Sequence, residues 1–311
     1  MSKTALLFAG QGAQVVGMGK DLAETLPTAR SWFDRANAVL GYDLSRICFH
    51  GPEDVLQQTA HAQPAIFLVG WVAFALLRER LPGFQFHATA GLSLGEFTAL
   101  AAAEALSFED GLRLVRERGG FMQEACEDSR GAMAAVLGLD EARLREVCEA
   151  TGVVMANFNC PGQIVLSGEA DRILQAIEMA KARGARRAVP LPVAGAYHSP
   201  LMATARLKFQ TPMTAVTLRP PVVPVVANVT ARPHGQPDEM RACLIEQVTA
   251  PVRWEASMRY LLAEGFTRFI ELGPGTALTG FMKRICSDVE VLRVGDVAGL
   301  DATVRALQSA P

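Results

Sequence analysis

The pentapeptide Gly91-Leu92-Ser93-Leu94-Gly95 places one serine between two glycines, each two residues away. It follows a short run of small residues, Ala88-Thr89-Ala90, and precedes the apolar stretch 96–103. This order predicts a strand, a sharp turn and a helix, with Ser93 on the turn, as in a nucleophile elbow. The following helix would direct its first N–H groups at an oxyanion formed beside the serine. The alternative is an ordinary polar residue on a glycine-bracketed turn.

Composition limits the class of protein. Half of the 311 residues are apolar, so the chain can bury a large core and is long enough for two domains. A formal net charge of −2 gives no general attraction for nucleic acid or an anionic membrane. We expect no signal peptide and no apolar run of membrane-spanning length. Six scattered cysteines, with no CxxC pair and no histidine-containing ligand cluster, indicate reduced thiols in a cytoplasmic protein without a metal site.

The alternation of short apolar strands with amphipathic helices predicts an α/β fold with a mainly parallel sheet. One internal block has a different order, βαββαβ, which is the ferredoxin-like plan. Its expected strands are 131–137, 153–158, 163–167 and 187–191, and its expected helices are 141–150 and 170–183. We therefore expect a small ferredoxin-like domain at 129–197, inserted into a large α/β-hydrolase-like catalytic domain formed by 1–128 and 198–311.

A nucleophilic serine needs a base, and the chain has five histidines. Four have no context that predicts catalysis: His50, His61, His87 and His234. His198 lies directly after the small domain, where the chain re-enters the large one, and interdomain clefts often hold functional sites. A neutral imidazole there could take the Ser93 proton and return it, although a structural histidine at a strand end is the alternative. No acidic residue stands out as a third member, so we expect a dyad whose histidine is oriented by a backbone carbonyl or an amide oxygen.

Arg118 interrupts the apolar face of a predicted helix. The helix begins at Ser107 with a sequence resembling a capping box. On a helical wheel, five apolar or small residues surround the arginine: Gly111, Leu114, Phe121, Met122 and Ala125. A buried guanidinium needs an anionic partner, and its planar fork suits a carboxylate. The sequence leaves two alternatives open, a structural salt bridge and a clamp for a substrate carboxylate.

The glycine-rich segment 8–19 follows an expected strand and invites comparison with dinucleotide-binding loops. The spacing does not fit, because Val15 stands where the third glycine would be needed. Gln11 in this loop could instead offer its side-chain amide to an oxyanion.

Together these motifs resemble the acyltransferase family that includes malonyl-CoA:acyl carrier protein transacylases of fatty acid synthesis and the acyltransferase domains of polyketide synthases. The similarity extends over nearly the whole chain. It is carried by 8–14 (FAGQGAQ), 63–66 (QPAI), 91–96 (GLSLGE), 118–119 (RG), 122–123 (MQ), 157–163 (NFNCPGQ), 197–200 (YHSP), 251–254 (PVRW), 271–275 (ELGPG) and 278–280 (LTG).

The resemblance implies a two-step transfer through a malonyl-serine. Ser93 would attack malonyl-CoA with His198 as general base, and Arg118 would hold the malonyl carboxylate. Gln11 and the backbone N–H of Leu94 would form the oxyanion hole. The phosphopantetheine thiol of acyl carrier protein would then accept the acyl group, so that the enzyme needs no bound cofactor. Two further residues also receive roles from the resemblance: Gln247 would hold the catalytic histidine, and Asn159 would line the cleft or stabilise a turn.

Two positions depart from the family pattern. The elbow usually has histidine where this chain has Leu92, which changes the polarity of the acyl pocket. Tyr197 replaces the phenylalanine that commonly precedes the catalytic histidine in malonyl-type enzymes. An aromatic ring there still fills the space that an α-methyl group would need, which resembles selectivity for malonyl over methylmalonyl groups.

Rival functions share some of these motifs. A malonyl thioesterase would hand the acyl group to water, a transferase of a polyketide or malonate decarboxylase system would serve another carrier, and a docking module would have lost activity. We expect a monomer. An acidic carrier protein could meet basic residues of the small domain (Lys181, Arg183, Arg186 and Arg187) or Lys283 and Arg284, the alternative being that these charges only form a solvated face.

Overall fold

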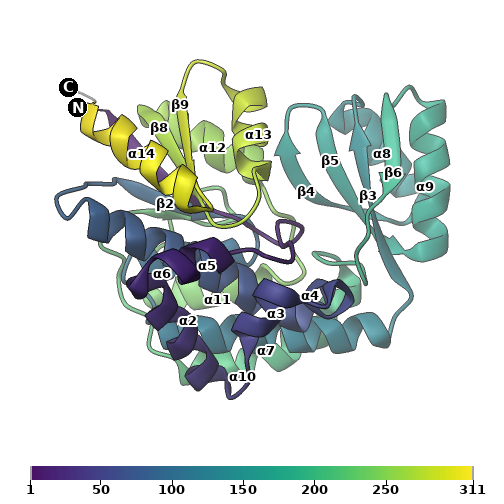
Figure 1. Ribbon diagram of the computed structural model, residues 1–311. Helices are drawn as coiled ribbons and strands as arrows, with labels where there is room; N and C mark the ends of the chain where they lie inside the picture. Colours follow the sequence, from purple (N-terminus) through teal and green to yellow (C-terminus); the bar gives the residue numbers. More distant parts are fainter. Residues whose placement is uncertain (1, 310–311) are drawn as a thin grey trace.

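The computed structural model describes residues 2–309, which form a large and a small sheet with helices around them (Figure 1). The large sheet has five parallel strands in the order β7-β2-β1-β8-β9. Their bounds are β1 Lys3–Phe8, β2 Ala88–Gly91, β7 Val225–Val226, β8 Phe266–Leu272 and β9 Glu290–Val294. The predicted α/β fold with a mainly parallel sheet is confirmed.

The small sheet is antiparallel, in the order β4-β5-β3-β6. Its strands are β3 Gly131–Leu137, β4 Val154–Cys160, β5 Gln163–Glu169 and β6 Arg187–Pro190, and its helices are α8 Glu141–Thr151 and α9 Ala170–Ala182. With its first and third strands in the centre, this is the predicted ferredoxin-like plan. The sheet and its helices have an apolar core of their own, which includes Val136, Leu144, Leu166 and Ile173. All six elements lie within 129–197, the segment we propose as an inserted domain.

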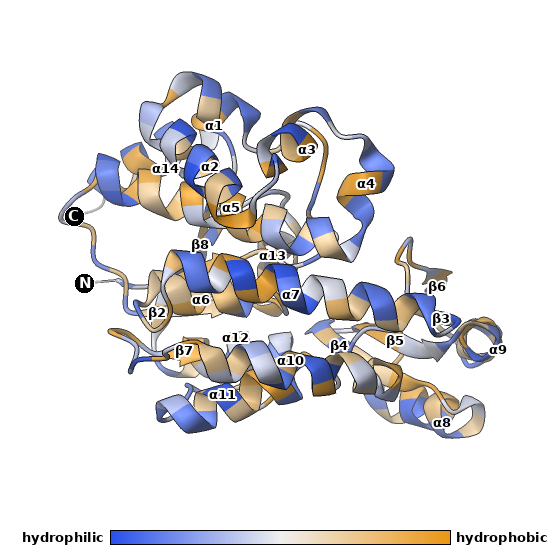
Figure 2. Ribbon diagram, turned by 90° about the horizontal axis from the view of Figure 1, so that it is seen from below, coloured by the Kyte–Doolittle hydropathy of each residue, from blue (hydrophilic) through white to orange (hydrophobic). Residues whose placement is uncertain are grey.

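The remaining helices surround the large sheet (Figure 1). Their bounds are α1 Lys20–Thr25, α2 Pro27–Leu40, α3 Leu44–His50, α4 Glu53–Gln57, α5 Thr59–Arg80, α6 Gly95–Ala102, α7 Phe108–Glu127, the 3-10 helix Pro200–Met202, α10 Ala203–Ala215, α11 Pro237–Glu246, α12 Trp254–Ala263, α13 Ala277–Ile285 and α14 Val297–Ser309. Ser107 caps α7 by accepting from the Asp110 N–H, as its sequence predicted. Figure 2 shows hydrophilic and hydrophobic residues alternating along α7, as expected for a helix with one buried face.

Helix α5 corrects the expectation about apolar runs. By length and composition it is long and apolar enough to cross a membrane, contrary to our sequence prediction. However, 72% of its apolar stretch is buried, and it packs against α6 and α7. An apolar helix enclosed by other elements is typical of the core of a globular protein.

Main-chain hydrogen bonds tie the small sheet to the segment between α11 and α12. The Phe158 N–H donates to the Val252 carbonyl (2.9 Å), and the Val252 N–H donates to the Ala156 carbonyl (2.8 Å). The segment that follows α11 therefore lies along the edge of β4, with Asn157 and Val252 forming a parallel bridge. From α13, Arg284 also donates to Gln163 Oε1 (2.7 Å) and to the Pro161 carbonyl (2.8 Å) in the β4–β5 turn.

Candidate active site

The turn between β2 and α6 holds Ser93 in the left-handed region, with φ 54°. Non-glycine residues rarely adopt this conformation, and when they do the strain is often found at functional sites. Steric crowding requires glycine at both flanking positions. A Cβ at Gly91 would overlap the main chain of Gly95, and a Cβ at Gly95 would overlap the carbonyl oxygen of Phe8. The predicted strand, turn and helix are therefore present, and only glycines permit their close approach.

The structure brings Ser93 and His198 together from positions 105 residues apart. Ser93 Oγ lies 2.8 Å from His198 Nε2. On the other side of the ring, Nδ1 lies 2.9 Å from the Gln247 carbonyl oxygen and 3.2 Å from the Ala250 carbonyl oxygen. Carbonyl oxygens only accept, so Nδ1 carries the proton and Nε2 is free to accept one from the serine.

Gln247 holds the imidazole through its main chain, not through its side chain. The side-chain amide points elsewhere: Nε2 donates to the Ser93 carbonyl oxygen (3.0 Å), and Oε1 accepts from Arg118 (2.9 Å). The predicted dyad, oriented by a backbone carbonyl, matches this geometry.

Burial sets the charge state of His198. The ring is 4% exposed, and desolvation, assisted by the nearby positive charge of Arg118, lowers its pKa from 6.5 to about 4. The imidazole is therefore neutral near pH 7, which is the form that a general base needs.

This shift predicts an unusual pH profile for the acylation of Ser93. The single-turnover rate should stay nearly constant from pH 8 to pH 5 and fall only as His198 is protonated near its pKa of about 4. Stopped-flow acylation over this range would measure it, with circular dichroism at each pH as the control for folding. A midpoint near the ordinary histidine value of 6.5 would contradict the neutral buried base.

Arg118 is 1% exposed and lies on the inner face of α7, as the helical wheel predicted. Its Nη2 donates to Ser93 Oγ (3.1 Å) and to Gln247 Oε1, and its Nη1 donates to Gln63 Oε1 (2.7 Å). Within residues 2–309 no carboxylate lies within ion-pair distance of it, and Nε has no acceptor. Of the two alternatives left open by the sequence, the protein salt bridge is thus absent there, and neutral amide oxygens accept from the guanidinium.

The charge of Arg118 persists in spite of its burial. Desolvation lowers the pKa of the guanidinium to about 10, opposed by the charge of Glu96, so the group stays protonated near pH 7. A buried cation with a free N–H attracts an anion. Its contact with Ser93 Oγ also favours negative charge developing on that oxygen.

Gln11 and Leu94 are the residues that we expect to form the oxyanion hole. The Gln11 side chain is engaged, since Oε1 accepts from Thr59 Oγ1 (2.8 Å) and Nε2 donates to the Tyr197 hydroxyl (3.4 Å). In contrast, the main-chain N–H groups of Gln11 and Leu94 have no protein acceptor among the described residues. This changes the donor we expect from Gln11, from the side-chain amide to the main-chain N–H.

A cavity of about 380 Å³ opens beside Ser93, between the large sheet and the small one. The predicted pocket residues Leu92, Tyr197 and Asn159 line it, together with Gln11 and His198. Asn159 is 6% exposed, and its Oδ1 has no hydrogen-bond partner within residues 2–309. An amide oxygen left unpaired on a cavity wall is suited to an N–H donor of a ligand.

Sequence reasoning missed the residues that support the elbow. Asn228 Oδ1 accepts from the Ser93 N–H (2.6 Å), and its Nδ2 donates to the Gly91 carbonyl (2.7 Å). Glu96 lies beneath the turn, and Gln63 holds Arg118. Glu96 and Gln63 stood within the motifs quoted above, but no pattern assigned them partners.

Comparison with known proteins identifies the family of the chain. Residues 5–304 match the acyl transferase domain family. The malonyl CoA-acyl carrier protein transacylase of Bacillus subtilis is 42% identical over 99% of this chain and 98% of that protein. The crystal structure of an acyl-carrier-protein S-malonyltransferase from Bartonella henselae has a TM-score of 0.94 at 39% identity, covering 98% of this chain and 99% of the other.

One further solved structure is a malonyl-transacylase in complex with a type II polyketide acyl-carrier protein. It has a TM-score of 0.95 at 36% identity and covers 98% of this chain and all of the other. Fold, site and relatives define an acyltransferase. The chain belongs to the acyl transferase family, and its full-length relatives are malonyl transacylases.

Proposed function

We propose that this enzyme moves the malonyl group from malonyl-CoA to the phosphopantetheine thiol of acyl carrier protein, in fatty acid synthesis. The observation that carries the proposal is the position of Arg118. A buried guanidinium with no carboxylate partner among the described residues lies 3.1 Å from the hydroxyl that would be acylated. An acyl group that brings its own carboxylate would satisfy this cation, whereas an acetyl group would leave it unpaired.

The first half-reaction follows from the dyad. His198 Nε2 takes the Ser93 proton as Oγ attacks the thioester carbonyl carbon. The main-chain N–H groups of Gln11 and Leu94 stabilise the resulting oxyanion, and Arg118 holds the malonyl carboxylate. When the C–S bond breaks, the imidazolium returns its proton to the CoA thiolate, and malonyl-Ser93 remains.

The second half-reaction repeats these steps in reverse with another thiol. The carrier's phosphopantetheine thiol gives its proton to His198 and attacks the malonyl ester, and Ser93 leaves with the proton restored. Asn159 Oδ1 would accept an amide N–H of the pantetheine arm, since it is unpaired on the cavity wall. This chemistry uses no bound cofactor.

Selectivity against branched acyl groups is assigned to Tyr197. Its ring lines the cavity and is 5% exposed, and its hydroxyl accepts from Gln11. The ring occupies space that the α-methyl of a methylmalonyl group would need. Leu92 makes this part of the cavity apolar, in place of the family's histidine.

The surface offers basic side chains for an acidic carrier. Of the candidates named from the sequence, Lys181 and Arg183 are paired with Glu178 and Glu146, and Arg284 is bound to the β4–β5 turn. Within the described chain Arg186, Arg187 and Lys283 are exposed and have no ion pair, so we propose these three for carrier docking. We further propose a monomeric enzyme that works in the cytoplasm.

Intact-mass analysis tests the proposed function. The enzyme would be mixed separately with malonyl-, methylmalonyl- and acetyl-CoA, and holo acyl carrier protein would then be added. We expect a malonyl adduct that transfers to the carrier, with little adduct from the other two thioesters. Release of free malonate in place of malonyl-carrier would identify a thioesterase, and no adduct from malonyl-CoA would overturn the proposal.

A further inference from the structure

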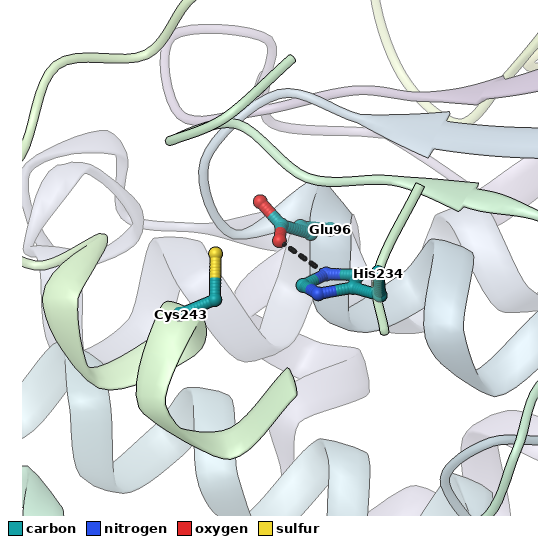
Figure 3. A group of neighbouring side chains, drawn as sticks. All are labelled: Glu96, His234 and Cys243. Carbon is teal, nitrogen blue, oxygen red and sulfur yellow. Dashed lines mark hydrogen bonds and ion pairs between the residues drawn. The ribbon is translucent and has the colours of Figure 1, made fainter. Parts of the chain in front are cut away.

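A polar cluster lies directly behind the elbow, formed by the buried side chains of Glu96 and His234 and the half-buried Cys243 (Figure 3). Side chains from α6, from the segment before α11 and from α11 meet there, although the sequence suggested no histidine-containing cluster. Glu96 is fully buried, and its Oε1 lies 2.7 Å from His234 Nε2. A buried carboxylate and a buried imidazole in contact form a strong, directional hydrogen bond.

The cluster has the residue types of a metal site, but two of its three side chains, Glu96 and His234, already contact each other. Burial, reinforced by the charge of Glu96, raises the pKa of the Cys243 thiol to about 12, so the thiol stays protonated near pH 7. Metal ligation requires the thiolate. His234 Nε2 is likewise engaged with Glu96 in place of a metal. The arrangement therefore favours an internal hydrogen-bond network.

Glu96 is the centre of that network. Its Oε1 contacts His234, while Oε2 accepts from the Asn228 N–H (3.0 Å) and from Gln247 Nε2 (2.7 Å). A buried carboxylate would be costly without such donors, and three of them fix its orientation.

Both residues that donate to Oε2, Asn228 and Gln247, also hydrogen-bond the main chain of Ser93. Asn228 accepts from the Ser93 N–H (2.6 Å), and Gln247 Nε2 also donates to the Ser93 carbonyl (3.0 Å). Both main-chain polar groups of Ser93 are thus held by residues that Glu96 orients. The left-handed φ of 54° needs such support, because an unrestrained serine would leave that conformation.

The Glu96 carboxylate is also linked to Arg118 through the side-chain amide of Gln247. Gln247 accepts from Arg118 Nη2 at its Oε1 and donates to Glu96 at its Nε2. Donation to the carboxylate fixes which end of the amide faces the guanidinium. Glu96 thereby offsets the buried positive charge at a distance, and Arg118 Nε is left without an acceptor among the described residues.

We propose that Glu96, held by His234, is a positioning residue that sets both the Ser93 elbow and the Arg118 guanidinium through Asn228 and Gln247. The inference deepens the proposed function and rests on it, since the readout is the choice between malonyl and acetyl groups. It assigns a role in selectivity to two side chains that touch neither the cavity nor the reacting atoms.

The test compares acylation of Glu96→Gln and wild type by malonyl-CoA and acetyl-CoA in single turnovers. The amide cannot accept all three hydrogen bonds, so Gln247 loses its fixed orientation and Arg118 its alignment. We expect malonyl acylation to fall by about 10–100-fold, and the malonyl-to-acetyl ratio to fall by about tenfold, since only the malonyl group has a carboxylate for Arg118 to hold. Glu149→Gln, on the exposed side of α8, is the matched control.

A pair of substitutions at His234 separates positioning from general destabilisation. His234→Gln keeps an N–H donor for Glu96, whereas His234→Leu removes it. We expect the leucine variant to lose the malonyl preference and the glutamine variant to retain most of it. Equal loss of both acyl groups in Glu96→Gln, or an unchanged ratio in His234→Leu, would overturn the inference. A wild-type enzyme that forms no malonyl adduct would instead overturn the proposed function.

Discussion

Ser93→Ala is expected to form no malonyl-enzyme after mixing with malonyl-CoA, whereas the wild type acquires one malonyl group. The substitution removes the only hydroxyl within the described chain that lies between His198 Nε2 and the Arg118 guanidinium. No other nucleophile shares that base, so transfer to the carrier should fall to background, a loss of roughly 10⁴-fold or more. Intact-mass spectrometry with a time course measures it.

The control is Ser31→Ala, which changes an exposed serine on α2 and should leave labelling unchanged. Thermal unfolding of Ser93→Ala should show a stability close to that of wild type, since alanine keeps the Cβ and leaves the backbone strain at φ 54° unchanged. Persistent labelling of a folded Ser93→Ala enzyme would assign the covalent intermediate to another residue.

Arg118→Ala should exchange one activity for another. Malonyl transfer is expected to fall by roughly 10²-fold or more, because two charge-assisted hydrogen bonds to the malonyl carboxylate are lost. Acetyl transfer should rise, since the variant no longer leaves a buried cation unpaired when an acetyl group enters. Competition between malonyl-CoA and acetyl-CoA, read as the two acyl-enzyme masses, measures the change directly.

Arg116→Ala provides the matched control, because it removes an exposed arginine from the same helix.

Arg118→Ala should also move the acid limb of the acylation profile to higher pH. The guanidinium lowers the pKa of His198, so its removal lets that pKa rise from about 4 toward 6.5. Malonyl acylation equal to wild type would remove Arg118 from the role of carboxylate clamp.

The sequence predicted the elements whose signal is local. The six strands and helices of the small sheet were placed within a few residues of their observed bounds, because each is a short periodic segment between turn residues. Helix α5 was less well predicted. Its apolar stretch is longer than we expected, because an apolar surface on all sides hides the helical period.

The reacting groups were also predictable, since each stands out against its local context. Ser93 has the elbow, Arg118 interrupts an apolar face, and His198 follows a domain junction. Their support was not predictable, because it depends on tertiary contacts over long separations. Asn228 and Gln247 meet the elbow from 135 and 154 residues away, and no periodicity connects them to Ser93.

The hydrogen bonds between β4 and the segment that follows α11 limit how the cleft can open. Val252 pairs with β4, and two residues earlier the Ala250 carbonyl accepts from the imidazole of His198. Swinging the antiparallel sheet outward would therefore drag the base away from the nucleophile. If the carrier docks on the small sheet as proposed, its contact would also alter the distance over which His198 and Ser93 exchange a proton.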